Sequence, residues 1–165
     1  MSVFLAGHAE QREESTFFWV CDFVIRQTDV KADLEKLGDC VAGCGHTVLL
    51  LEPWNDPEPL KRAYRIKEVF HTQQSQSRFD LVMGKAQQQA YVEALQNNFD
   101  VASAAVSNVN VRNAQCRNPS DQKRILAEFA ALPGGIAKCN ERVCEMLREQ
   151  LAAQGKAALQ RMPKK

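Results

Sequence analysis

HTVLLLEPWNDPEPLKRAYRIKEVFHTQ, residues 46–73, combines the most apolar run of the chain with a turn and a helix rich in charged and aromatic residues. The run HTVLLLE at 46–52 is short and almost continuously apolar, which predicts a central, buried β-strand. PWNDPEP at 53–59 contains three prolines, so no regular element crosses it. A helix over 59–72 is expected next, with Pro59 in its first turn, where a missing N–H breaks no hydrogen bond.

Upstream of this stretch, the pattern predicts two strands and one helix. FFWVCDFVI at 17–25 is apolar with aromatic and β-branched residues, which is typical of a strand buried on both faces. SVFLA at 2–6 predicts a short edge strand. Between 30 and 44 the apolar residues recur at intervals of three and four, the period of an amphipathic helix. Gly45 stands where a left-handed C-terminal cap belongs.

Downstream, one more strand is followed by helices alone. SRFDLVMG at 77–84 predicts that strand, and a long helix over about 85–107 follows it. Asn118 or Ser120 caps the next helix, and a last helix covers about 137–161. Strands joined by helices of this length run parallel, with right-handed crossovers. The predicted fold class is therefore α/β, with a three-layer, mostly parallel sheet followed by a helical C-terminal extension.

Two parts of the chain are expected from this order of elements. The first is an α/β domain at 1–107. The second is a helical extension at 108–165, packed on that domain or on a partner. The extension carries an apolar stripe that includes Val143 and Leu147, and such a stripe must be buried against something.

Composition excludes several classes of partner. The chain is 45% apolar and 25% charged, as an ordinary globular protein is. A formal net charge of +1 argues against nucleic acid or an anionic membrane recognised through bulk charge. No apolar run approaches the roughly 18–20 residues that cross a bilayer, and the first residues lack the features of a signal peptide. We therefore expect a cytoplasmic protein with no nucleic-acid partner and no membrane partner.

Six cysteines raise the question of a metal site. Two pairs, Cys40 with Cys44 and Cys139 with Cys144, are spaced four and five residues apart and lie on separate predicted helices. A structural zinc site needs four ligands in two matching pairs, usually with CxxC-like spacing. We therefore expect no metal, and buried or half-buried thiols in a reducing compartment.

The central stretch and the strand before it resemble a TIR-type domain. The similarity lies in FWVCDF at 18–23, the amphipathic helix, the strand that ends in Pro53-Trp54, and the helix RAYRIKEVF at 62–70. It is closest to the divergent TIR-like modules that precede tetratricopeptide arrays in algal and protist proteins. TIR domains usually carry Trp-Cys-Leu-x-Glu-Leu on that helix. This chain reads YRIKEV at 64–69, so the Trp and Cys are replaced and the Glu is kept.

The related HET (heterokaryon-incompatibility) domain shows a similar pattern. It has an apolar strand with Asp followed by Gln, here Asp22 and Gln27, and a later Arg-Ala-aromatic helix with a Glu. The resemblance covers about residues 17–84. It implies a TIR or flavodoxin-like sheet that lacks a full first strand–helix unit, because little chain precedes residue 17.

The resemblance also implies an activity. In TIR domains that cleave NAD+, the Glu of this helix is the catalytic residue, which corresponds to Glu68. A carboxylate there would stabilise the oxocarbenium-like state in which the nicotinamide glycosidic bond breaks. NAD+ would be the substrate, and no bound cofactor is expected. The alternative is that Glu68, at the edge of the helix's apolar stripe, forms an ordinary ion pair with Arg65.

The turn after the central strand supplies candidate binding residues. Trp54, Asn55 and Asp56 lie beyond the carboxyl end of the strand, where open α/β sheets bind ligands. Trp54 would stack on a nucleotide base or simply cover the end of the sheet. Tyr64, one turn before Glu68, is a further binding candidate.

Asp22 is the last candidate, because a carboxylate in a buried strand must be paired or change its pKa. It would line the same crevice as Glu68 or pair with Arg62. Two functions follow from these residues. One is a non-enzymatic TIR-like signalling module that binds proteins, including a second copy of itself. The other is an NAD+ glycohydrolase that uses Glu68.

Overall fold

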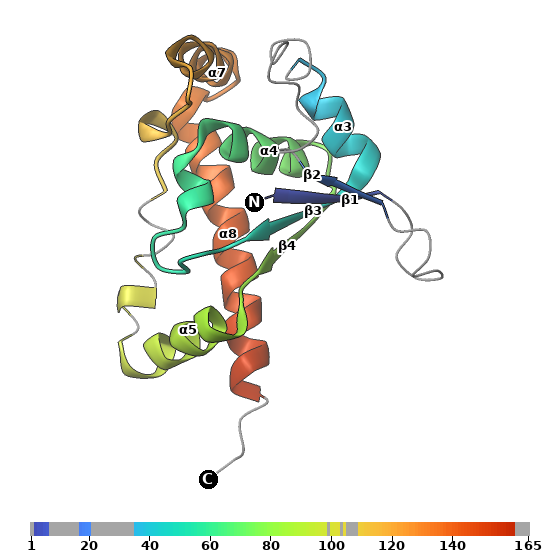
Figure 1. The fold of residues 1–165 in the computed structure, drawn as a ribbon. Helices are drawn as coiled ribbons and strands as arrows, with labels where there is room; N and C mark the ends of the chain where they lie inside the picture. The colour runs from blue at the N-terminus through green and yellow to red at the C-terminus, as the bar shows by residue number, and fades with distance from the viewer. Residues whose placement is uncertain are drawn as a thin grey trace.

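The computed structural model describes residues 2–6, 17–20, 35–98, 100–102, 104 and 109–160. Within these ranges the chain is a mixed α/β protein, with a small sheet that packs against helices on its β3–β4 half (Figure 1). The predicted α/β class is confirmed at this level.

The sheet has four described strands in the order β2-β1-β3-β4. Their bounds are β1 Ser2–Ala6, β2 Phe17–Val20, β3 Gly45–Leu50 and β4 Arg78–Val82. β1 pairs antiparallel with β2 and with β3, whereas β3 pairs parallel with β4. The prediction of a mostly parallel sheet is therefore wrong for the described strands, and β1 is an interior strand instead of an edge strand.

The reason for this error is the position of β1. Because β2 and β3 are both antiparallel to β1, they point in the same direction, as strands joined through a helix should. β1 lies between them and separates them. The crossover rule therefore predicted the direction of β2, β3 and β4 correctly, but it could not show which strands become neighbours.

The described helices are α3 (Leu37–Cys44), α4 (Ala63–Gln74), α5 (Lys85–Asn97), α7 (Pro119–Ala131) and α8 (Gly135–Gln160), with short 3-10 turns η2 (Glu58–Lys61) and η3 (Val111–Asn113). Gly45 ends α3 with φ of 69°, and its N–H donates to the carbonyl of Val41, as the predicted cap requires. The Asn118 side chain accepts a hydrogen bond from the Ser120 N–H, which confirms Asn118 as the N-cap of α7.

Two predicted helices are interrupted in the structure. The helix expected over 59–72 begins as η2 and restarts as α4, because Arg62 between them is extended. Its neighbours pair with a distant loop: the Ala63 N–H donates to the Gln115 carbonyl, and the Gln115 N–H donates to the Lys61 carbonyl. The helix expected over 85–107 ends as α5 at Asn97, since Asn98 has non-helical backbone angles.

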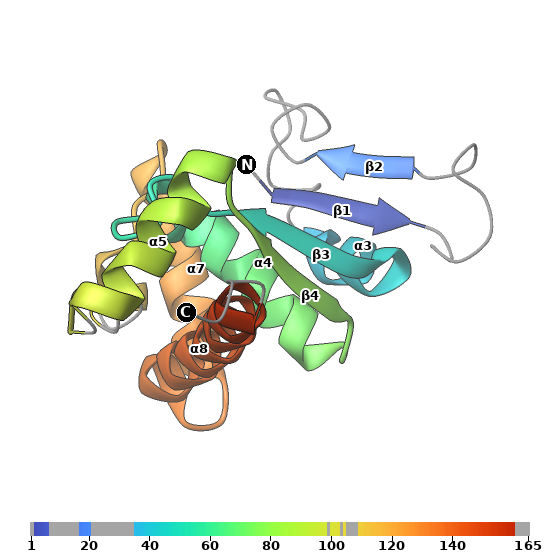
Figure 2. The same cartoon turned by 90° about the horizontal axis from the view of Figure 1, so that it is seen from below.

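The helices are arranged around the β3–β4 half of the sheet. Along β3 and β4 the buried residues alternate, with Thr47, Leu49, Phe79 and Leu81 turned to the side that α4 covers. β3 is thus buried on one face and half-buried on the other. α3 lies beside α4, and α5 lies on the opposite side of the sheet (Figures 1 and 2).

α8 closes the β4 edge of the sheet. It runs past β4 and contacts α4, α5 and α7 as well (Figure 2). The side-chain amide of Gln154 donates to the backbone carbonyl of Leu81, so part of the edge of β4 is satisfied from the helix. The apolar stripe of α8, with Val143 and Leu147, joins the same core as Leu49 of β3. The boundary at 107/108 stays a prediction.

Candidate functional site

α4 is the helix that carries the predicted catalytic residue, and it is unusual in burying charge. Arg65 is 8% exposed, Lys67 is 6% exposed and Glu68 is fully buried. Strands β3 and β4 and helices α3, α7 and α8 all contact this helix. Charged side chains leave water only where partners compensate for the lost hydration, so their partners decide what α4 can do.

Glu68 is held by Arg65. One terminal guanidinium nitrogen of Arg65 donates to both carboxylate oxygens of Glu68, at 2.9 and 3.1 Å. The sequence predicted this partner correctly. Its prediction of an edge position is wrong, because Glu68 is not exposed. A helical wheel predicts exposure for a helix that is covered on one face only. α4 is instead contacted on several sides, so residues at the edge of its apolar stripe are buried as well.

Buried hydroxyls extend this polar interior toward the sheet. The Thr72 hydroxyl donates to the backbone carbonyl of Glu68 at 2.8 Å and lies 2.7 Å from the hydroxyl of Thr47 on β3. Both threonines are fully buried. The hydrogen bonds connect the turn of α4 that carries Glu68 directly to the sheet.

The candidates in the turn after β3 divide into one buried and two exposed residues. The Trp54 ring is 6% exposed and packs on Tyr91 of α5, with 5.2 Å between ring centroids. Its backbone N–H donates to the side chain of Gln87. Asn55 and Asp56 are exposed, and Asp56 accepts a hydrogen bond from Lys61 at 2.6 Å. The geometry corresponds to the alternative in which Trp54 covers the end of the sheet.

Asp22 and Gln27 lie outside the described residues. Tyr64, the remaining candidate, is partly exposed and turned toward α7 instead of toward Glu68. Its buried hydroxyl has no hydrogen-bond partner in the described part of the chain.

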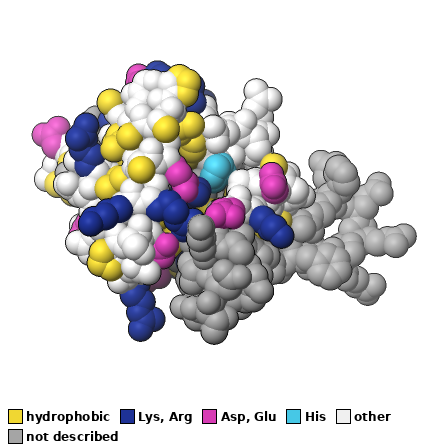
Figure 3. Space-filling view, turned by 90° about the horizontal axis from the view of Figure 1, so that it is seen from above, with side chains coloured by type: hydrophobic (Ala, Val, Ile, Leu, Met, Phe, Trp, Pro, Cys, Tyr) yellow, Lys and Arg dark blue, Asp and Glu magenta, His cyan; other side chains and the backbone are white. Residues whose placement is uncertain are grey.

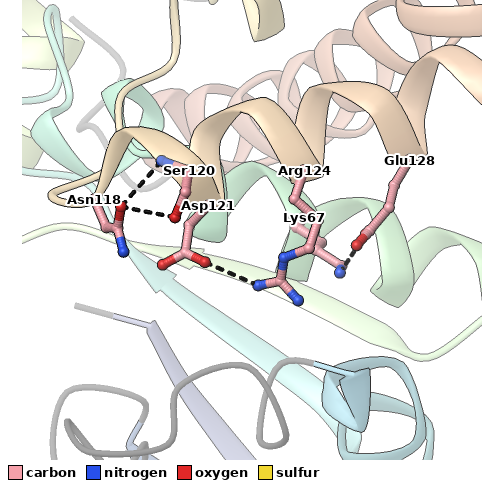
Figure 4. A network of polar contacts seen from close by, with 6 residues as sticks. All are labelled: Lys67, Asn118, Ser120, Asp121, Arg124 and Glu128. Atoms are coloured by element: carbon pink, nitrogen blue, oxygen red, sulfur yellow. Dashed lines mark hydrogen bonds and ion pairs between the residues drawn. The ribbon is translucent and has the colours of Figure 1, made fainter.

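Tyr64 belongs to a group of polar residues between two helices, which we name the α4–α7 polar row. It consists of Tyr64, Lys67 and His71 on α4 and of Asp121, Arg124 and Glu128 on α7. Figure 4 shows its contacts: Lys67 donates to Glu128 at 2.5 Å, and Arg124 donates to Asp121 at 3.1 Å. In each helix the members are three or four residues apart, so they share one side. That repeated spacing was visible in the sequence, although the pairing of the two helices was not.

Burial favours the neutral forms of Tyr64 and His71, whereas the other members of the polar row form ion pairs. It raises the pKa of Tyr64, and the nearby Asp121 carboxylate raises it further. Burial, and then Asp121, raise the pKa of the Cys116 thiol beside the row to about 11. Burial lowers the pKa of His71, and the positive charge of Lys67 adds to this. At neutral pH Cys116 is therefore a thiol, which is a poor nucleophile and metal ligand.

The other described cysteines are also free thiols. Cys40 and Cys44 are half-buried, and Cys139 and Cys144 are buried, all as free thiols, which the sequence predicted. Burial raises the pKa of Cys139 to about 12. Among the residues that the structure describes, no three His, Cys, Asp or Glu side chains are grouped so as to bind a metal ion.

The described surface over α3 and α7 has no large patch of a single charge. Figure 3 shows acidic and basic side chains intermixed on this side of the molecule. Within the described ranges, none of the helices combines the length and the apolar character needed to cross a bilayer.

Comparison with known proteins adds no relative. No protein-family model matches the chain, and no curated protein or solved structure matches it at a significant level. What can be said of function therefore rests on the residues themselves.

Proposed function

We propose that this chain is a non-enzymatic, TIR-like protein-interaction module, which acts in the cytoplasm through protein partners that include a second copy of itself. The observation that carries the proposal is the state of Glu68. Its carboxylate is fully buried and bonded through both oxygens to Arg65. A carboxylate in this position supports the packing of α4 and does not meet a substrate from solvent.

The other members of the predicted NAD+ site support the same conclusion. Trp54 would have to turn its ring toward a nucleotide, but the ring packs on Tyr91 in the core. Tyr64 belongs to the α4–α7 polar row and lies near Asp121. An active site needs its groups around one accessible concavity. Glu68, Trp54 and Tyr64 instead each contact a different part of the fold.

The choice of protein partners follows from the surface and the composition. The net charge of +1 and the intermixed charges of Figure 3 do not favour nucleic acid or an anionic lipid surface. The expectation of contacts between copies comes from the TIR-like resemblance of residues 17–84. No cofactor forms part of the proposal.

The test combines an activity assay with a measurement of mass. Purified chain is incubated with NAD+ and free nicotinamide is quantified by chromatography, over a wide range of protein concentration because assembly could be needed for turnover. We expect nicotinamide at the level of the protein-free blank. Light scattering over the same concentrations is expected to show a molar mass that rises above the monomer.

A matched pair of variants makes the outcome decisive. Glu68→Gln removes the candidate catalytic charge, and the double variant Asn55→Ala, Asp56→Ala alters the exposed rim without touching the core. Nicotinamide release that both changes reduce would replace our proposal with the NAD+ glycohydrolase. A molar mass that remains monomeric at every concentration would exclude self-association and leave only other proteins as partners.

A further inference from the structure

α3 meets α4 closely at one histidine. Gly38 of α3 lies so near that a methyl group in place of its hydrogen would be 3.1 Å from both Cε1 and Nδ1 of His71. On the same helix Leu37 and Val41 are buried almost completely. The ring of His71 is therefore part of the α3–α4 interface, and it has little space on the side of Gly38.

The charges around His71 do not favour a second positive charge. Lys67 lies one turn earlier on α4, and the Glu128 carboxylate of α7 already accepts a hydrogen bond from it at 2.5 Å. From α3, the exposed Asp39 carboxylate favours the charged ring electrostatically, and Nδ1 of His71 lies 3.1 Å from Oε1 of Gln74. Glu128 is already paired with Lys67. Asp39 therefore opposes, from α3, the two influences that disfavour a charged His71, which are partial burial and the charge of Lys67.

We propose that protonation of His71 releases α3 from α4, as a local opening that leaves the remaining helical core folded. A charged imidazole needs hydration that Gly38 restricts on one side of the ring, so separating the two helices supplies more of it. Burial, and then Lys67, lower the pKa of His71 in the closed state. Protonation therefore favours the open state, as the proposal requires.

α3 is a short element, so its release disturbs less of the fold than the release of α8 would. It has eight residues, whereas α8 has 26 and packs on α4, α5 and α7. α7 is anchored on its own side by Ile125 and Phe129, which are 0% and 2% exposed. Short elements with few buried side chains open at lower free energy than the global transition. Acid therefore uncovers the α3-facing side of α4 before the core unfolds.

Hydrogen exchange followed by mass spectrometry tests this opening on the full chain. Peptides covering residues 37–44 and 120–150 are compared at pH 7.5 and pH 5, after correction for the intrinsic pH dependence of exchange. We expect corrected exchange in 37–44 to be faster at pH 5 than at pH 7.5, because the pKa of His71 is lowered in the closed state. Exchange in 120–150 should stay the same.

Two variants make the result specific. His71→Gln keeps a neutral polar side chain and should abolish the pH dependence in 37–44. Gly38→Ala, which presses a methyl group on the ring, should raise exchange in 37–44 already at pH 7.5. If 37–44 exchanges equally at both pH values, or if its acid response persists in His71→Gln, the coupling to His71 is wrong. Equal acceleration in 120–150 would likewise overturn it, because the opening would be global.

If His71→Gln does not fold, a nuclear magnetic resonance titration of the His71 ring in the unaltered chain gives the same decision. The midpoint of its titration must coincide with the midpoint for exchange in 37–44. Different midpoints would contradict the proposal.

Discussion

Two ion pairs that α4 forms among the described residues differ in the burial of the carboxylate and in the helix that supplies it. Arg65 and Glu68 pair within the helix, and the carboxylate is fully buried. Lys67 pairs with Glu128 of α7, whose side chain is 41% exposed. The first pair has lost its hydration on both sides, whereas the second keeps one partner in water. We therefore expect the fold to depend more on the buried Glu68 than on the half-exposed Glu128.

The largest effect is expected from breaking the buried pair. Glu68→Ala leaves the Arg65 guanidinium buried without this carboxylate, so the free energy of unfolding should fall by about 3–5 kcal/mol. Urea denaturation measures the loss. Replacing both partners by apolar residues, Arg65→Met with Glu68→Leu, should recover much of it. A loss below 1 kcal/mol for Glu68→Ala would show that the pair contributes little to the fold.

A smaller loss is expected at the threonine pair that joins α4 to β3. Thr72→Val removes the hydroxyl that bonds the Glu68 carbonyl and leaves the Thr47 hydroxyl buried without it. Unfolding should become easier by about 1–3 kcal/mol, since an unsatisfied buried polar group keeps its desolvation penalty. The double variant Thr47→Val, Thr72→Val serves as control and should be more stable than Thr72→Val alone.

The pH dependence of stability tests the contribution of His71, the partly buried residue of α4 that contacts α3. The pKa of His71 is lowered in the folded chain. As pH falls, His71 is therefore protonated in the unfolded chain before it is protonated in the folded chain. The contribution of His71 is therefore complete above the unfolded value of 6.5 and is lost as pH falls from there through the lowered folded value. Urea midpoints between pH 7.5 and pH 5 should fall more for the unaltered chain than for His71→Gln. Equal falls would exclude this residue as the cause.

The smallest effect is expected at the half-exposed pair. Glu128→Gln keeps the shape of the side chain, and the Lys67 amine lies beside a position that water reaches. Although Lys67 is buried, water reaches the glutamate side of the pair, so the loss should be about 1 kcal/mol, and it should shrink in high salt. A loss as large as that of Glu68→Ala would mean that exposure is not what separates the two pairs.

Some of the candidate site was visible in the sequence because it depends on nearby residues. Arg65 and Glu68 are three residues apart on a helix, so their pairing follows from helical geometry alone. The place of that pair relative to solvent could not follow, because it depends on elements far away in the chain that pack around α4. The same holds for Trp54, whose partner Tyr91 comes from another helix.

The sequence by itself determined several local features: the αL cap at Gly45, the N-cap of α7 at Asn118 and the pairing of Arg65 with Glu68. These depend on backbone angles and on short-range hydrogen bonds, which neighbouring residues control. Only the tertiary structure decided that β1 inserts between β2 and β3, and that Glu68 is buried. Both result from contacts between segments distant in sequence, where the gain from burial outweighs the preference of each segment taken alone.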